Sequence, residues 1–506
     1  QLGKHAADVN SRFCCAHKWC SLGTYTTGLC ACNEVVGNIT APPAHPSATA
    51  GSFRSVGGLR RPPAPCSDAP MRPTRLRQIG LSTPLRLGGL ALIMIAACAL
   101  LFWHFILYPA CEICDVVAYG VDAAHLQDDY FGVSQRRTYG YPLFLSVVFA
   151  GYEWDATWGI FSPRVAIVQT MLYLAACLAL FFAILPHSRT FAWCAAIGLM
   201  CNPFVLNYVP LRMTEGVTAS ISVLIAACAV SLGGHSSTRR LVAILFAGSL
   251  LAGLAMMIRP ASLSLFIAWA TAVALVAWQS PERRLLVCVA AIAGMVIPLL
   301  PQFAINYLAY QQIGFFPTKD LGGMQRCVAL ANFKYQTIVM PDRSAIPVFY
   351  RSFVFTKAEI GAHGAWLYLL SPLRGAAMAA GHIFQSVNHD YFFPYVYDRN
   401  AWLHAPINVI GHLVLYLAGY ACWVSARSSQ KSLVPVAAAV FALVAVAMTI
   451  LVNSVAVVET RFGMLIYLVA GPLAAWGVVR LWSSPRRGKV AAAGLLFGIS
   501  AATLSF

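Results

Sequence analysis

The chain has few charged residues. Only 10% of its 506 residues are Asp, Glu, Lys or Arg, whereas 59% are hydrophobic and the mean hydropathy is +0.68. Soluble domains carry about 25% charged residues, so this chain has too little polar surface to cover a globule in water. The composition excludes an ordinary soluble domain and indicates an integral membrane protein with lipid as its solvent.

Acidic residues are scarcer than basic ones, with 18 Asp and Glu against 35 Lys and Arg, for a net charge of +17. A net charge of this size is also found in nucleic-acid-binding proteins. Here the Lys and Arg residues stand in short clusters between apolar runs and not on one face of a soluble domain. That placement is typical of membrane topology, and we expect no nucleic-acid partner.

Nucleotide-binding motifs are also missing. The sequence contains no Walker loop, no GxGxxG after a strand and no long polar segment that forms a nucleotide domain. A membrane protein without these motifs has no ATP-binding unit of its own. The sequence therefore does not indicate ATP-driven transport by this chain alone.

The first seventy residues lack an apolar run. They are rich in Ser, Ala, Pro and Gly, begin with Gln1, and end where Met71 opens a basic lead into an apolar stretch. We interpret residues 1–70 as disordered or as an over-extended translation start. A Cys-rich metal or redox module is the alternative, but no CxxC pair occurs among the cysteines of this segment, which are Cys14, Cys15, Cys20, Cys30, Cys32 and Cys66.

Residues 71–506 are dominated by apolar runs long enough to cross a bilayer, which takes about twenty residues as a helix. They predict an all-α polytopic membrane protein with ten or eleven transmembrane helices. The predicted spans are 87–108, 163–185, 190–208, 215–233, 241–258, 262–279, 285–308, 404–425, 433–453, 462–482 and 489–506.

Basic clusters occupy every second connection between these spans. By the positive-inside rule they face the cytoplasm, as does the N-terminus. The opposite face then holds two long segments, 109–162 and 309–403, and function is expected on this face because its loops are large. The clusters are Arg72 to Arg86, His187–Arg189, Arg239–Arg240, Glu282–Arg284, Arg427–Lys431 and Arg486–Lys489.

Ionisable residues near a bilayer are costly, so their positions are informative. Here they gather at the predicted outer ends of the spans. Carboxylates there supply groups for acid–base chemistry, and guanidinium groups present a planar fork suited to phosphate oxygens. The residues are Asp115, Asp128, Asp129, Arg136, Arg137, Arg212, Glu215, Arg259, Glu459 and Arg461.

These residues occur in motifs whose order resembles the GT-C superfamily of membrane glycosyltransferases, in particular bacterial relatives of protein O-mannosyltransferases and of the lipid A aminoarabinose transferase. The resemblance covers roughly residues 85–482. It depends on Asp115 with Tyr119 four residues on, and then on RTYGYPLFL from Arg137. Thr214-Glu215-Gly, GLAMMIRP ending at Pro260, and Glu459-Thr-Arg461-Phe follow.

The resemblance implies a fold, a reaction and roles for residues. The expected reaction moves a sugar from a polyprenyl-phosphate donor to a glycan, lipid or protein acceptor outside the cytoplasm, in a bacterial inner membrane. A first-loop carboxylate acts as the base in such enzymes, which implies Asp115, with Asp128 and Asp129 as the fallback. Relatives often have adjacent acidic residues there, whereas Asp115 stands between Cys114 and Val116.

The remaining candidate residues are expected to bind substrate. Arg259 and Arg461 would hold the donor phosphate, and Glu215 and Glu459 would orient the arginines or the sugar hydroxyls. No metal ligands are predicted, and no cofactor is required, although a divalent cation is compatible with the reaction. The full set of candidate binding residues is Tyr119, Arg137, Arg212, Glu215, Arg259, Glu459 and Arg461.

Each of these residues also has a purely structural explanation. Asp115 fits a solvated loop or a helix N-cap, and Asp128 with Asp129 fits a solvated loop pair. Arg136, Arg137 and Arg259 fit anchors at the lipid headgroups, Arg212 with Glu215 fits an i,i+3 pair, and Glu459 with Arg461 fits a surface ion pair. Cys111 and Cys114 fit a disulfide as well as two free thiols. In the second outer segment, 345–360 and 366–387 have the pattern of amphipathic helices at the membrane surface, and 388–395 is an aromatic cluster with His389 and Asp390.

Two other functions fit part of the pattern. A transporter or flippase of a lipid-linked sugar or small anion is the main alternative. It would show internal repeats and charges near mid-membrane, and neither is seen. A polysaccharide polymerase or ligase would share the outer arginines and the lipid-linked donor, so the sequence does not separate it from a transferase.

Overall fold

We describe the protein from a computed structural model of the 506-residue chain. The described residues are 88–89, 91, 94–95, 114–128, 133, 135, 137–150, 162–234, 237–317, 319, 321–339, 345–389, 395–396, 404–427, 434–456 and 459–504. Predictions for 1–70, for Cys111 and for Asp129 therefore concern residues outside this part of the chain.

The membrane-protein prediction is confirmed. Over the described residues, eight helical segments are long and apolar enough to cross a bilayer. Their ends agree with the predicted spans to within a few residues, because uninterrupted apolar runs favour helices that bury all backbone hydrogen bonds internally. They are Pro163–Ile184, Thr214–Ser231, Thr238–Ile258, Pro260–Gln279, Pro281–Tyr310, Ala405–Arg427, Val436–Val455 and Arg461–Trp482.

Within the described residues the helices run from α4 to α21, with short 3₁₀ turns at several junctions. The helices are α4 (Cys114–Asp128), α5 (Gly140–Val148), α6 (Pro163–Ile184), α7 (Arg189–Met200), α8 (Pro203–Leu206), α9 (Thr214–Ser231), α10 (Thr238–Ile258), α11 (Leu263–Gln279), α12 (Arg284–Val296), α13 (Leu300–Tyr310), α14 (Leu321–Ala331), α15 (Lys357–His363), α16 (Leu367–Leu370), α17 (Pro372–Ser386), α18 (His404–Arg427), α19 (Val436–Val455), α20 (Met464–Trp482) and α21 (Arg487–Thr503). The 3₁₀ turns used below are η7 (Gly364–Trp366) and η9 (Thr460–Gly463).

Three predicted spans differ from this picture. The run 190–208 is divided into α7 and the short α8, because Asn202 precedes Pro203 and a residue before proline disfavours the helical conformation. The run 489–506 forms the 17-residue α21, which is shorter than the eight spanning segments. The run 87–108 lies almost entirely outside the described residues.

Close helix packing in the bundle relies on glycine. A side-chain carbon added at Gly198 of α7 would lie 2.4 Å from the backbone of Gly471 in α20, and one added at Gly471 would lie 2.1 Å from the carbonyl oxygen of Gly198. Small residues let two helices approach in a bilayer, where dispersion forces and not hydrophobic burial drive association. Asn202 reinforces this junction by donating a hydrogen bond to the carbonyl of Tyr467 at 3.0 Å.

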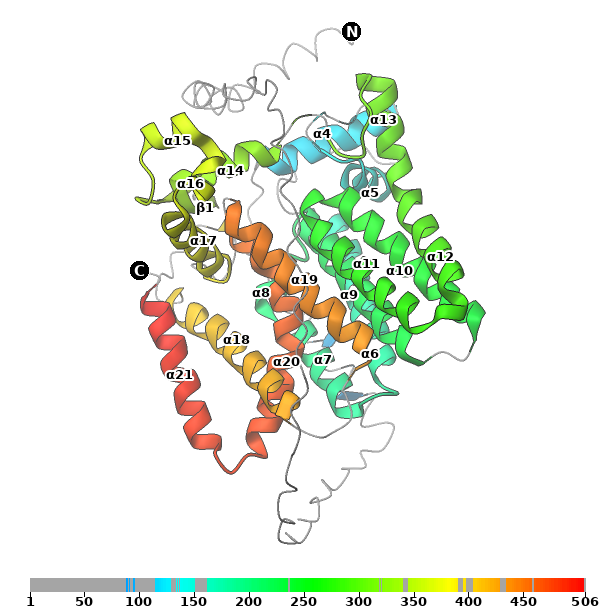
Figure 1. The fold of residues 1–506 in the computed structure, drawn as a ribbon, viewed down its shortest axis with the longest axis vertical. Coiled ribbons are helices and arrows are strands. Elements are labelled where there is room, and N and C mark those ends of the chain that lie inside the picture. Colours follow the sequence, from blue (N-terminus) through cyan, green and yellow to red (C-terminus); the bar gives the residue numbers. More distant parts are fainter. Residues whose placement is uncertain are drawn as a thin grey trace, which may run out of the picture.

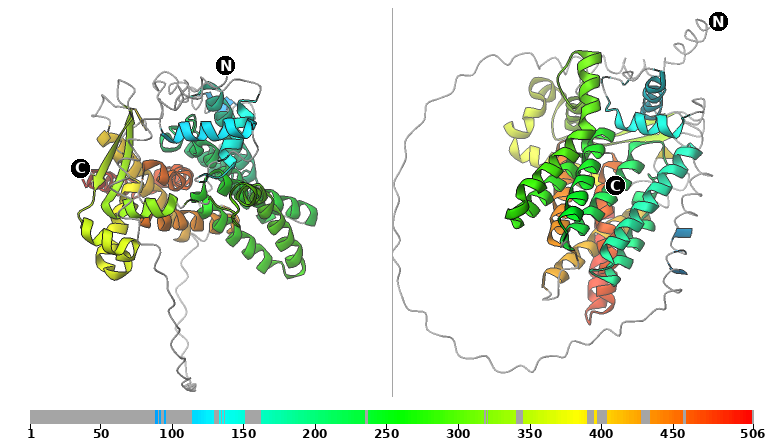
Figure 2. Two further views of the ribbon diagram at one scale, coloured as in Figure 1. Left: turned by 90° about the horizontal axis from the view of Figure 1, so that it is seen from above. Right: turned by 90° about the vertical axis from the view of Figure 1, so that its right-hand side faces the viewer.

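The predicted outer segments lie together at one end of the helix bundle. Helices α4 and α5 come from the first segment, and α14 to α17 come from the second (Figure 1). The turns between α6 and α7 and between α20 and α21, which carry basic clusters, lie at the opposite end. Seen from above, α4 and the group α15–α17 cover different sides of this outer end (Figure 2).

The second outer segment also contains a small sheet, which corrects the sequence prediction of a helix over 345–360. Strand β1 (Asn332–Val339) pairs antiparallel with β2 (Ala345–Arg351), from Asn332 opposite Arg351 to Val339 opposite Ala345. The two-residue β3 (Tyr395–Val396) pairs parallel to β1, giving the order β2-β1-β3. The stretch 345–351 is rich in β-branched and aromatic residues, which favour strands.

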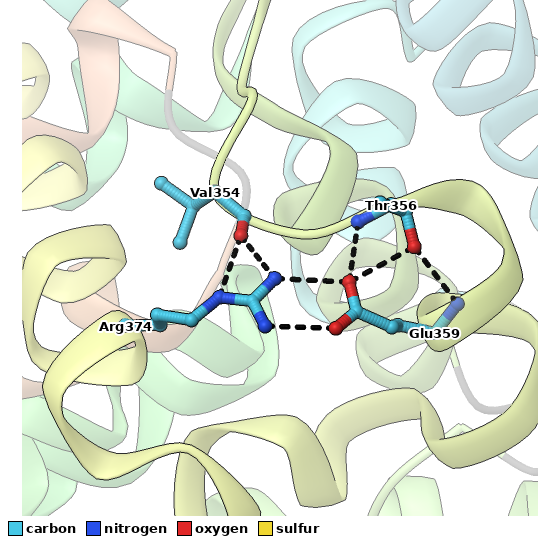
Figure 3. Close-up of polar contacts among 4 residues, drawn as sticks. All are labelled: Val354, Thr356, Glu359 and Arg374. Carbon is cyan, nitrogen blue, oxygen red and sulfur yellow. Dashed lines mark hydrogen bonds and ion pairs between the residues drawn. The ribbon is translucent and has the colours of Figure 1, made fainter.

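Helices α15 and α17 of this segment are joined by an ion pair (Figure 3). Arg374 contacts both carboxylate oxygens of Glu359, at 2.7 and 2.9 Å, and also donates to the carbonyl of Val354. Glu359 completes a capping box with Thr356 at the start of α15. The side chains thus fix how α15 begins and how it lies on α17.

Candidate functional site

Glu215 is the centre of a buried ion-pair network at the end of the bundle that holds the predicted outer segments. Its Oε1 atom lies 2.9 Å from Nη1 of Arg259 and 3.5 Å from Nη1 of Arg461. Only 1% of the Glu215 side chain is exposed, compared with 16% for Arg259 and 9% for Arg461. A second carboxylate, Glu459, pairs with Nε of Arg461. These side chains do not form the solvent-exposed ion pair that was the alternative for Glu459 and Arg461.

The network forms where helices begin and end. Glu215 lies in the first turn of α9, where the helix dipole favours a negative charge. Arg259 is the residue after the last turn of α10 and precedes Pro260, which cannot continue that helix. Arg461 lies in η9, just before α20. Segments far apart in the sequence thus place three charged side chains together.

Apolar groups line the two arginines. The ring centre of Phe462 lies 4.9 Å from Cζ of Arg259 and 5.5 Å from Cζ of Arg461. Nη1 of Arg461 also lies 3.8 Å from the sulfur of Met213. Such a lining lowers the local dielectric and strengthens the interaction of the guanidinium groups with any anion that enters.

Arg212 adds a third positive charge near Glu215. Its side chain is 1% exposed, and both Arg212 and Glu215 act electrostatically on the phenol of Tyr141. The set of Arg212, Arg259 and Arg461 against Glu215 and Glu459 carries a net charge of +1. A buried set with excess positive charge is suited to an anionic ligand such as a phosphate.

Tyr141 joins the first outer segment to this network. Burial raises the pKa of its hydroxyl well above the usual value, and Arg212 opposes the effect only in part, so the phenol keeps its proton. The preceding Gly140 lies against α10, since an added side-chain carbon would meet the carbonyl oxygen of Met257 at 2.5 Å and the amide nitrogen of Ile258 at 2.8 Å. The start of α5 is therefore fixed beside Arg259.

Two sequence-predicted binding residues stack next to Tyr141. The guanidinium of Arg137 lies 4.0 Å from the ring centre of Tyr119. The Tyr119 ring meets the Tyr141 ring edge-on, with 4.9 Å between their centres. The stacked side chains of Arg137, Tyr119 and Tyr141 therefore connect the first outer segment to the Glu215 network. Both predicted residues, Tyr119 and Arg137, lie beside that network.

The predicted acidic residues of the first outer segment are located only in part. Asp115 lies in the first turn of α4 and Asp128 is the last residue of that helix, whereas Asp129 is outside the described residues. The side chains of Asp115 and Asp128 are not among those described. The site is therefore built from its arginines, glutamates and tyrosines.

Gln169 is a site residue that sequence reasoning missed. It lies in the second turn of the predicted span 163–185, is fully buried, and donates hydrogen bonds to the hydroxyl of Tyr141 at 3.3 Å and to the carbonyl of Leu211 at 3.1 Å. An amide within an apolar run is itself a signal, because polar groups in a membrane helix are costly without a partner.

A second buried polar cluster lies in the other outer segment, next to η9. Lys334 of β1 is fully buried and donates to the carbonyl of Asn388 at 2.8 Å. The ring of His389 packs against both Phe204 and Tyr467, at 4.5 and 5.0 Å between ring centres. Burial, followed by the charge of Lys334, lowers the pKa of His389 well below its usual value, so this imidazole is neutral.

His382 connects this segment to the bundle. It is fully buried; its Nδ1 lies 3.0 Å from the carbonyl oxygen of Ser454 at the end of α19, and its Nε2 lies 3.1 Å from that of Asn332. Within the described part of the chain, no group of three His, Cys, Asp or Glu side chains is placed to hold a metal ion.

Comparisons with known proteins give a distant structural similarity. No family model and no curated protein matches the chain. Among solved structures, the crystal structure of the Archaeoglobus fulgidus oligosaccharyltransferase, tethered through a disulfide to an acceptor peptide with an NVT sequon, is similar with a TM-score of 0.47 and 13% identity. The similarity covers 84% of this chain and 54% of that chain, so this chain spans about half the length of the matched structure.

Proposed function

We propose that the protein is a membrane glycosyltransferase that moves a sugar from a polyprenyl-phosphate donor to a glycan, lipid or protein acceptor on the extracytoplasmic side. The observation that carries this proposal is the buried network of Glu215, Arg259 and Arg461 at the end of the bundle opposite the basic turns. The order of the motifs that contain these residues resembles that of GT-C enzymes and supports the same proposal.

The network suits the phosphate of such a donor. When the sugar leaves, negative charge develops on the phosphate oxygen, and fixed guanidinium groups in a low-dielectric site stabilise that charge. Glu215 holds Arg259 and Arg461 in place, so little reorganisation is needed during the reaction. A lipid-linked donor reaches the helix ends from the membrane, which is consistent with a site built at the bilayer boundary and without a nucleotide-binding domain.

The acceptor requires a base to take the proton of its nucleophilic group. Asp115 is our proposed base, with Asp128 and Asp129 as the fallback, because all three belong to the first outer segment. Helix α4, which contains Asp115 and Asp128, lies at the same end of the bundle as the network (Figure 1). Once this base takes its proton, the nucleophilic atom of the acceptor bonds to the anomeric carbon, and the bond from that carbon to the phosphate oxygen breaks as the phosphate leaves toward Arg259 and Arg461.

The first experiment compares sugar transfer by the purified protein in lipid nanodiscs from a panel of radiolabelled polyprenyl-phosphate sugars to membrane extracts. We expect labelled product with the wild-type protein and little with Asp115→Asn or Arg259→Gln. Glu282→Gln, at an exposed position in a basic turn at the opposite end, is the control and is expected to retain activity. Absence of product from every donor, with folded protein, would contradict the transferase and favour the transporter alternative.

A further inference from the structure

Gln169 determines which way the hydroxyl of Tyr141 points. A single nitrogen, Nε2 of Gln169, lies 3.1 Å from the carbonyl oxygen of Leu211 and 3.3 Å from the hydroxyl oxygen of Tyr141. A carbonyl oxygen only accepts hydrogen bonds, so Leu211 fixes the orientation of the amide group. The second N–H of the amide then donates to Tyr141, and the Tyr141 oxygen accepts.

The proton of the Tyr141 hydroxyl is therefore directed away from Gln169. Within the described residues, the contact with Gln169 is the sole hydrogen bond of this hydroxyl, and Tyr141 is 0% exposed. A buried donor without an acceptor is destabilising. A bound ligand that offers an acceptor atom would satisfy this hydroxyl.

The surroundings of Tyr141 indicate the chemistry of that ligand. Leu211, which shares the amide of Gln169, directly precedes Arg212, and Ile258, which packs against Gly140, directly precedes Arg259. Tyr141 thus lies between the backbone segments that carry two of the three arginines. Non-bridging phosphate oxygens are anionic and accept several hydrogen bonds, so one oxygen can accept from a phenol and a guanidinium together.

We propose that Tyr141 is a phosphate-binding residue of the donor site, whose O–H donates to a non-bridging oxygen of the polyprenyl phosphate, and that Gln169 is the positioning residue that aims it. This inference depends on the proposed function, because it assigns an additional contact to the same donor. It assigns roles to two residues that neither the basic clusters nor the outer-face charges indicate.

Gly216 is part of the same arrangement. An added side-chain carbon at Gly216 would lie 2.0 Å from Oε1 of Gln169 and 2.5 Å from the carbonyl oxygen of Val209. Glycine at this position of α9, next to Glu215, lets the amide of Gln169 pack against the helix backbone. The oxygen of the Gln169 amide therefore lies against Gly216, and its nitrogen faces Tyr141 and Leu211.

The experiment measures binding of undecaprenyl phosphate to the full-length protein in nanodiscs, with undecaprenol, which lacks the phosphate, as the reference ligand. Hydrogen bonds to charged groups contribute about 1.5–3 kcal/mol, so we expect Tyr141→Phe to weaken binding of the phosphate by about 10- to 100-fold. Binding of undecaprenol should not change. Tyr173→Phe is the matched control, because this buried hydroxyl of α6 donates to the carbonyl of Leu199.

Gln169→Leu and the double variant Gln169→Leu/Tyr141→Phe test the positioning role. If Gln169 acts through Tyr141, Gln169→Leu weakens phosphate binding in the wild-type background but adds little in the Tyr141→Phe background. Additive losses would show that Gln169 acts independently of Tyr141, and would overturn its role. Tyr173→Phe removes a satisfied hydrogen bond, whereas the proton that Tyr141→Phe removes has no acceptor among the described residues, so Tyr141→Phe should melt no lower than Tyr173→Phe. A lower melting temperature for Tyr141→Phe would reveal misfolding.

The outcomes separate the inference from the proposed function. One outcome is that the wild-type protein binds undecaprenyl phosphate more tightly than undecaprenol and that Tyr141→Phe binds undecaprenyl phosphate as tightly as the wild type. The role proposed for Tyr141 is then wrong, but the proposed phosphate site is supported. If the wild-type protein does not distinguish the two lipids, the proposed donor site fails and the inference fails with it. A loss confined to Tyr141→Phe and absent in Tyr173→Phe supports the inference.

Discussion

The carboxylate of Glu215 lies 2.9 Å from the guanidinium of Arg259, 44 residues further along the chain, with 1% of the Glu215 side chain exposed. This pair joins the start of α9 to the end of α10. Arg461 approaches the same carboxylate oxygen at 3.5 Å from a third segment. Glu215 therefore holds three parts of the bundle together as well as organising the candidate site.

Removing the Glu215 charge should destabilise the protein. Glu215→Gln leaves the buried Arg461 and the partly buried Arg259 without their shared carboxylate, and loss of one partner of a buried pair costs about 3–5 kcal/mol. We expect a lower melting temperature in detergent, measured by thermal unfolding, with little change for the exposed Glu282→Gln. Equal melting temperatures for Glu215→Gln and the wild type would show that the network is not structural.

Two glycine substitutions should change the stability of the fold in opposite directions. Gly216→Ala places a carbon 2.0 Å from Gln169 Oε1, so we expect a loss of about 1–3 kcal/mol from overpacking. Gly419→Ala in α18 meets no atom within 4 Å and removes the conformational freedom of a helical glycine, so a gain of up to about 1 kcal/mol is expected. Chemical denaturation of each variant gives the change in the free energy of unfolding and its sign. A Gly216→Ala variant as stable as the wild type would contradict the close contact.

The start of α15 should loosen in acid. Hydrogen bonds from Arg374, followed by those from Thr356, lower the pKa of Glu359 from 4.5 to about 2. A carboxylate with a lowered pKa in the folded state adds stability above its unfolded pKa, and this stability is lost as the pH falls from about 4.5 towards 2. Hydrogen–deuterium exchange of the Glu359 amide should therefore accelerate across this range after correction for the intrinsic rate. Glu359→Gln should show no such pH dependence, and the same dependence in that variant would rule out this carboxylate as its cause.

The apolar face around α16 should contact lipid. Trp366, Leu369 and Leu373 are 70%, 71% and 87% exposed, and α17 is fixed at the end of α19 through His382 and Ser454. Apolar and aromatic side chains at the level where a membrane helix ends are stabilised in the interface. A photoreactive amino acid at position 373 should cross-link to lipid in nanodiscs, and one at the exposed Lys357 should do so far less. Equal yields at both positions would contradict selective insertion of this face.

Much of the fold could be predicted because a bilayer restricts the choice of structure. An apolar run of about twenty residues has to form a helix in lipid, and runs such as 215–233 and 433–453 correspond closely to α9 and α19. The break between α7 and α8 could have been predicted from Asn202–Pro203, because the residue before a proline disfavours the helical conformation. The uniform hydropathy of 190–208 concealed this signal. The strand β2 was missed because its alternation is short, and it is stabilised by pairing with β1, which no local pattern reveals.

The candidate site could be predicted only as a set of separate residues. Arg259 next to Pro260, and Glu215 at a helix start, are visible in the sequence as charges at the ends of spans. Gln169 was overlooked because a single amide changes the hydropathy of a 22-residue apolar helix very little. Its importance depends on contacts with Tyr141 and Leu211, which lie 28 and 42 residues away along the chain.

The sequence by itself determined that this chain is a helical membrane protein with its charged residues at the ends of the spans, because the cost of placing charges and open backbone groups in lipid acts on every residue locally. The tertiary structure decided that Glu215 pairs with Arg259 and Arg461, and that Gln169 orients Tyr141. Those relationships depend on which helix ends meet and on close packing at Gly140 and Gly216, and such contacts between distant segments leave no periodic pattern in the chain.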